Sequence, residues 1–146
     1  MQKIAPLLFV VTAFFPLISI ASPETQVQSE RELRTECAFE ITGVRECLQQ
    51  KERASEVVLK DAEKRVLDVL TKWDEDPKYS SQAKAKLIAS NKAFGQYRDA
   101  QCAFASALGG GAIGNALEMG RLACVAELNG RRAFQLRDLV SDLPMK

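Results

Sequence analysis

The chain has 146 residues, of which 47% are hydrophobic, and its 20 basic and 19 acidic side chains leave a formal net charge of +1. A balance so near neutrality excludes a general nucleic-acid or membrane-surface binder, because those proteins carry a marked excess of basic side chains. Histidine is absent from the sequence. This removes the usual Ser-His and Cys-His nucleophile arrangements and histidine metal sites, so we expect a protein that is not an enzyme and has no cofactor.

Residues 1–21 have the pattern of a secretory signal peptide. Lys3 precedes an apolar run over 4–20 that two prolines interrupt, which argues against a membrane-spanning helix. Ser19 and Ala21 form a small-x-small pattern, so we expect cleavage after Ala21. A retained N-terminal anchor is the alternative. With no cysteine at the cleavage point for acylation, the prediction is a soluble periplasmic or secreted protein that has no membrane contact after cleavage.

The 125 residues that follow are the size of one domain. Residues 22–76 carry a net charge of −5 and residues 77–146 a net charge of +5. The two halves could therefore pack as complementary surfaces, or the second half could present a basic face to an anionic partner. The acidic side chains of the first half recur along a predicted solvated helix face, which disfavours a glycosidase built on a carboxylate pair.

Four cysteines, Cys37, Cys47, Cys102 and Cys124, remain after the predicted cleavage. Disulfides persist in the compartments that exported proteins reach. A zinc site is the competing interpretation, but the chain has no histidine and no Cys-x-x-Cys pair. We therefore predict two disulfides, and these residues alone leave all three connectivities open.

The predicted domain begins with a short helix. Residues 22–28 show no apolar period and are predicted to be a flexible lead-in to a domain over 29–142. Leu33, Cys37 and Ile41 then recur at helical spacing. Thr42 precedes a glycine and is expected to cap the next helix with its hydroxyl.

A long amphipathic helix is predicted next. Its apolar residues keep intervals of three or four: Val44, Cys47, Leu48, Ala54, Val58, Ala62, Val66, Val69 and Trp73. Three carboxylates at 74–76, at the negative end of the helix dipole, and then Pro77 predict its end.

Two further helices complete the predicted fold. Ser80 or Ser81 is expected to cap the first, which ends at the glycines 109–111, and the second is expected over about 112–140 with a possible kink at Asn129. The predicted inward stripes are Ala83, Leu87, Phe94, Tyr97, Gln101, Phe104 and Leu108, and then Ile113, Leu117, Gly120, Cys124, Leu128, Leu136 and Leu139. The expected fold is all-α, a small antiparallel three-helix bundle with a short N-terminal helix, stapled by two disulfides.

Several short motifs occur together in this chain. They are Arg98-Asp99-x-x-Cys102 after an aromatic, a second cysteine at Cys124, Arg132-x-x-x-Leu136, and the upstream set Cys37, Thr42, Glu46 and Cys47. This set resembles one known family, the lysozyme-inhibitor LprI-like domain. The resemblance covers residues 37–136. The chain departs from the family pattern at Val125, at Asn129 and after Asp61, so it resembles a divergent member.

The resemblance implies an exported helical protein whose partner is a lysozyme, as for the named inhibitor of the family. It also implies the pairs Cys37–Cys47 and Cys102–Cys124. For the second pair, an axial mismatch of roughly 9 Å across the glycine turn is small enough for a helix tilt to absorb. The alternative function is a non-inhibitory envelope interaction or scaffolding module of immunity or stress-related type. The oligomeric state stays open.

The candidate partner-binding residues are Arg98, Gly109, Gly110, Gly111, Asn115 and Arg121. Arg98 and Asp99 are neighbours on a helix, so their side chains are expected to diverge. Arg98 would either hold an acidic residue of the first long helix or bind a carboxylate of a partner. Trp73 and Tyr97 are expected in the core.

The glycine run is either a plain connector or a loop that enters a cleft of the partner. Glycines let the backbone approach another molecule closely. A lysozyme cleft carries two catalytic carboxylates, so an inhibitor gains by presenting cations or hydrogen-bond donors there. Arg98 and Arg121 are the nearest cations in sequence to Gly109–Asn115 and are predicted to serve this purpose.

Overall fold

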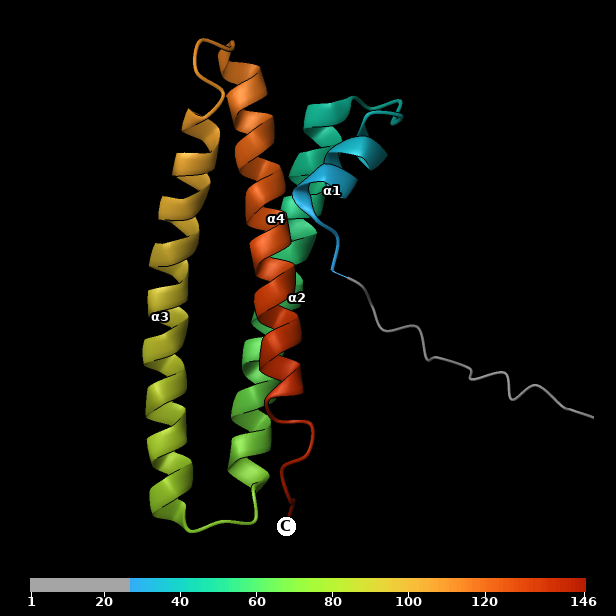
Figure 1. The fold of residues 1–146 in the computed structure, drawn as a ribbon. Helices are drawn as coiled ribbons and strands as arrows, with labels where there is room; N and C mark the ends of the chain where they lie inside the picture. Colours follow the sequence, from blue (N-terminus) through green and yellow to red (C-terminus); the bar gives the residue numbers. More distant parts are fainter. Residues whose placement is uncertain (1–26) are drawn as a thin grey trace, which may run out of the picture.

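A computed structural model describes residues 27–146, and the predicted signal peptide and residues 22–26 of the lead-in lie outside that range. Four helices follow in order: α1 (Glu30–Cys37), α2 (Val44–Lys72), α3 (Pro77–Ala107) and α4 (Gly114–Asp138) (Figure 1). Within residues 27–146 no strand is formed, apart from one isolated bridge between Trp73 and Met145. The predicted all-α bundle with a short first helix is confirmed.

The central helix is α4. It packs along α2 on one side and against α3 on the other, while α1 crosses the end of the molecule against both α2 and α4 (Figure 1). Five consecutive residues of α4, Leu122 to Ala126, are buried, because neighbours cover the helix on several sides. Small side chains permit this close packing: a Cβ on Gly130 would lie 2.9 Å from a methyl carbon of Val27. At least the end of the predicted lead-in is therefore packed against the domain.

The helix starts differ from the predictions at α2 and α3. Gly43, with a φ of 97°, precedes α2, and no side chain caps that helix, so the predicted cap at Thr42 is wrong. Pro77 does not lie between helices but opens α3, where its missing N–H costs nothing. Asp76 caps α3 by accepting a hydrogen bond of 2.7 Å from the backbone N–H of Lys78, so the predicted cap at Ser80 or Ser81 is also wrong.

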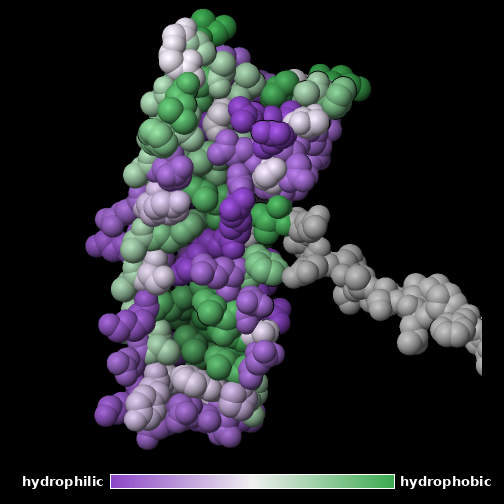
Figure 2. Space-filling model, viewed as in Figure 1, coloured by the Kyte–Doolittle hydropathy of each residue, from purple (hydrophilic) through white to green (hydrophobic). Residues whose placement is uncertain are grey.

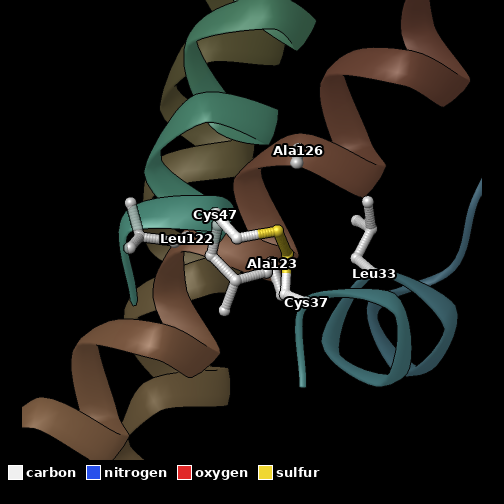
Figure 3. Close-up of a cluster of buried hydrophobic side chains, with 7 residues drawn as sticks. Leu33, Cys37, Cys47, Leu122, Ala123 and Ala126 are labelled. Atoms are coloured by element: carbon white, nitrogen blue, oxygen red, sulfur yellow. A yellow bond between two sulfur atoms is a disulfide. The ribbon is translucent and has the colours of Figure 1, made fainter. Parts of the chain in front are cut away.

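Two large apolar clusters hold the helices together, and a third, smaller one, made of Cys102, Cys124 and Val125, joins α3 to α4. Of the two large clusters, one joins α1 to α2 and α4, and it comprises Leu33, Cys37, Cys47, Leu48, Leu122, Ala123 and Ala126 (Figure 3). The other joins α2 to α3 and α4, and it comprises Leu59, Ala62, Val66, Leu70, Leu87, Ala133 and Leu136. Trp73 packs at the edge of the second cluster, as predicted.

A polar layer lies along α4 between its residues in the first large cluster, which end at Ala126, and those in the second, which begin at Ala133. Asn129 is fully buried on α4, its amide nitrogen donates to Ser55 of α2 at 3.0 Å, and its amide oxygen accepts from Arg98 of α3 at 3.1 Å. One side chain therefore links all three long helices. The helix α4 continues past Asn129 to Asp138, without a break at the predicted kink.

Both disulfides implied by the family resemblance are formed. Cys37 pairs with Cys47 and ties α1 to the start of α2, while Cys102 pairs with Cys124 and ties α3 to α4. The second bond matters for α3 because only Leu87 and Cys102 of its 31 residues are buried. The disulfide therefore fixes the half of α3 that precedes the turn into α4.

The apolar stripes predicted for α3 and α4 are only partly buried. Along α3, Tyr97, Phe104 and Leu108 are exposed, and at the two ends of α4 so are Ile113 and Leu139. The cause is the position of α3 at the edge of the bundle, where α4 covers one side and α2 touches little of the rest. Figure 2 shows hydrophobic side chains at the upper end of the α3 side and a hydrophobic hollow in the lower half, inward of the hydrophilic outer edge of α3.

Candidate partner-binding end of the molecule

The turn between α3 and α4 protrudes at the end of the molecule where α1 also lies (Figure 1). Two glycines are required in it. Gly110 has a φ of 56°, a left-handed conformation that other residues adopt only with strain. A Cβ on Gly109 would lie 2.3 Å from a methyl carbon of Leu117. The hydroxyl of Ser106 donates to the carbonyl of Leu117 at 3.1 Å, which ties the two helices together below the turn.

No charged residue occurs over residues 100–117, the segment that we call the hairpin tip. Its large apolar side chains are turned outward: Leu108 is 72% exposed and Ile113 81% exposed. Exposed apolar groups grouped on one protruding element are typical of an interaction site.

The hairpin tip also presents backbone donors. α4 begins at Gly114, its N-cap residue is Ile113, and no side chain caps the helix. The first N–H groups of a helix have no intrahelical acceptor and lie at the positive end of the helix dipole. Asn115, in this first turn, is exposed. This turn can therefore donate hydrogen bonds to an anion without carrying a charged side chain.

Arg98 does not lie at the hairpin tip. It is ten residues before Leu108, about 15 Å along the helix. Its guanidinium donates to Asn129 and, at 2.9 and 3.0 Å, to Asp99. The expectation that Arg98 and Asp99 diverge is therefore wrong, because the long arginine side chain folds back to its neighbour. No acidic residue of α2 holds Arg98, which is instead part of the polar layer.

Arg121 pairs within its own helix. It donates two hydrogen bonds, of 2.8 and 2.9 Å, to the carboxylate of Glu118, one turn earlier. These bonds hold the pKa of Glu118 below its usual range, and they raise the pKa of Arg121. The structure thus brings Gly109–Asn115 together as one surface, while the two arginines are engaged elsewhere.

A hollow of about 530 Å³ separates the hairpin tip from α1. Glu30 and Arg34 line it on the α1 side, and small or apolar residues line it on the hairpin side: Ala105, Ser106, Leu108, Gly109, Ala112, Ala116, Leu117 and Gly120. Burial and repulsion by Glu127 raise the pKa of Glu30, with Arg34 acting in the opposite direction. This end of the molecule is therefore forked, with an apolar wall facing an ion pair.

Sequence reasoning missed two features of the site and its support. Asn129 was noted as a departure from the family pattern and as the place of a kink, but not as the residue that links three helices. Ile41 was expected on the apolar stripe of the first helix but lies fully exposed in the following loop, beside Phe39.

Residues 27–146 contain no group of three or more His, Cys, Asp or Glu side chains that could hold a metal ion. Over the same residues no helix is long and apolar enough to span a membrane.

The fold is that of a small helical domain with two disulfides. Comparison with protein families matches residues 35–136 to the family described as Lysozyme inhibitor LprI, so the chain belongs to that family. The match spans most of the chain and includes every motif on which the resemblance rested. No curated protein and no solved structure matches the chain.

Proposed function

We propose that this protein inhibits a peptidoglycan-cleaving lysozyme outside the cytoplasm, after export and removal of residues 1–21. The observation that carries the proposal is membership of the lysozyme inhibitor family over residues 35–136. In the proposed mechanism the hairpin tip enters the substrate cleft of the lysozyme and blocks it.

The chemistry of the hairpin tip fits such a cleft. The cleft holds one protonated and one ionised catalytic carboxyl group. The uncapped first turn of α4 offers N–H donors to the ionised carboxylate, and Leu108 and Ile113 offer apolar surface to the cleft walls. Because residues 100–117 carry no charge, entry requires no desolvation of a charged side chain of the inhibitor. The donors are thus backbone groups, in place of the arginines that the sequence favoured.

The contact in this mechanism extends beyond the turn itself. A specific protein complex needs about 1,000 Å² of buried area in total. The turn alone is small, but the hairpin tip and the neighbouring α1 side together form a broad end. The disulfide between Cys102 and Cys124 holds the hairpin in place before binding, which lowers the entropic cost of association.

The test is a cell-wall lysis assay with c-type and g-type lysozymes and the oxidised protein. Gly111→Trp is the informative variant, since a side chain there meets open space and the backbone is not left-handed. It should weaken inhibition at least about tenfold by obstructing entry. Gly95→Trp, in open space in the middle of α3, is the matched control and should inhibit like the wild type. Lack of inhibition of every lysozyme at micromolar protein would refute the function, and full inhibition by Gly111→Trp would refute the role of the tip.

A further inference from the structure

A second apolar projection lies at the same end of the molecule, in the loop between α1 and α2 (Figure 1). We call residues 38–43 the α1–α2 loop. Phe39 is 84% exposed and Ile41 is fully exposed. Two large apolar side chains in water on a six-residue loop are unfavourable for the isolated protein, and such groups mark interaction sites.

The α1–α2 loop is held in one conformation. The disulfide between Cys37 and Cys47 joins the residues on either side of it. Gly43 adopts a φ of 97° at its end, and backbone hydrogen bonds of 3.1 to 3.3 Å run from Phe39 to Glu36, from Glu40 to Cys37 and from Gly43 to Glu40. Phe39 and Ile41 are therefore presented by a closed ring of chain, so little conformational freedom is lost when they are covered.

We infer that the α1–α2 loop is a second contact element of the inhibitor and rests on the protein surface beside the cleft that the hairpin tip enters. This inference depends on the proposed function. Phe39 and Ile41 are the apolar anchors, and the hollow between α1 and the hairpin tip receives the rim of the cleft.

The charge around the α1–α2 loop defines the kind of partner. Glu40 lies between the two apolar residues, and residues 30–46 carry five acidic and three basic side chains, of which Glu36 is paired with Lys51 of α2 at 2.6 Å, so one negative charge remains in excess. The loop therefore adds negative charge next to an uncharged hairpin tip, which suits a partner with a basic surface, as many lysozymes have. This local negative charge is not apparent from the net charge of the whole chain, which is +1.

The decisive comparison uses two double variants in the same lysis assay. Phe39→Ser with Ile41→Ser removes both anchors and should raise the concentration needed for half-inhibition at least about tenfold. Tyr79→Ser with Ile88→Ser removes two exposed apolar side chains from the far half of α3 and should change it less than about twofold. Because all four side chains are exposed, both variants should keep the helical circular dichroism and the Cys37–Cys47 bond.

A charge variant tests the partner chemistry. Glu40→Lys should slow association with a basic lysozyme several-fold at low salt, and the difference should shrink at high salt because ions screen exposed charges.

The outcomes separate this inference from the proposed function. If wild-type protein inhibits and the Phe39/Ile41 variant inhibits equally well, the loop assignment is wrong while inhibition by the hairpin tip stands. Equal losses in both double variants would also overturn the loop assignment. If the wild type inhibits no lysozyme, both proposals fail. Loss of binding to phosphatidylglycerol vesicles with inhibition intact would assign the loop to a membrane surface instead, and would overturn the inference.

Discussion

Removing the disulfide between Cys102 and Cys124 should destabilise the C-terminal half of α3, which this bond ties to α4. Replacing both cysteines by alanine deletes a cross-link over a sequence separation of 22 residues. The loop-closure entropy of such a loop corresponds to about 3 kcal/mol of unfolding free energy. Little else offsets this loss, because Leu87 is the only buried side chain of α3 apart from Cys102 itself. Partly buried Phe94, Arg98 and Ala105, and the hydrogen bond from Ser106 to the carbonyl of Leu117, are its main remaining contacts there.

The assay is guanidinium unfolding combined with amide hydrogen exchange. The unfolding free energy should fall by about 3 kcal/mol, and exchange should accelerate in residues 95–107 while the amides of α2 near Leu59 change less. Removing the pair Cys37 and Cys47 by the same substitution is the control, and it should accelerate exchange around α1 instead. A loss below about 1 kcal/mol, or equal acceleration in α2 and α3, would refute the reasoning.

Two further substitutions test the polar layer around Asn129 and the carboxylate of Glu30 on α1. Asn129→Ala should lower the unfolding free energy by about 2–3 kcal/mol, since Ser55 and Arg98 lose their buried partner. The control is Asn115→Ala, at an exposed position, which should change the unfolding free energy little. Equal effects of the two substitutions would contradict the role of Asn129. Glu30→Gln should raise the unfolding free energy at pH 7 by less than about 1 kcal/mol, because the raised pKa of Glu30 means that its ionised form is disfavoured in the folded state. As the pH falls through the raised folded-state pKa toward 4.5, protonation stabilises the wild type and the difference should disappear; chemical unfolding from pH 7 to pH 4 would show a constant difference if this were wrong.

The helical spacing of α2 predicted much of its core. Ala62, Val66 and Cys47 lie on the predicted stripe and are buried. That helix faces a continuous neighbour, α4, so much of its apolar side is covered, but Ala54 and Val58 of the predicted stripe are exposed, and their expected burial is wrong. The disulfide pairing came from the family resemblance, because four cysteines on four helices permit three pairings and spacing alone selects none of them.

The same spacing failed on α3. A period of three or four shows which residues share a face, but not whether another element covers that face. Tyr97 and Phe104 share a face that neither α2 nor α4 covers completely, so both remain exposed. Likewise Pro77 predicts the end of one helix as readily as the start of the next. Only the hydrogen bond between Asp76 and Lys78 distinguishes the two.

The glycine turn between α3 and α4 is where the sequence predicted it, its role in binding stays a prediction, and the predicted positions of the two arginines beside it are wrong. Glycine content identified Gly109–Gly111, because a left-handed residue and a close approach both require glycine. Arg98 was assigned to the loop on its proximity in sequence. In a helix of 31 residues, however, a residue ten positions before the turn lies well away from it along the helix axis. Arg98 instead binds the buried amide of Asn129, a partner that hydrophobic periodicity does not reveal.

The residues proposed to contact the partner differ from those that stabilise the fold. Leu108, Ile113, Phe39 and Ile41 are exposed, so replacing them removes few contacts from the folded chain. The two disulfides hold the elements that carry them, and α2 and α4 supply most of the buried surface. A change of inhibition in variants of these four residues can consequently be interpreted as a change in the contact with the partner, without correction for unfolding.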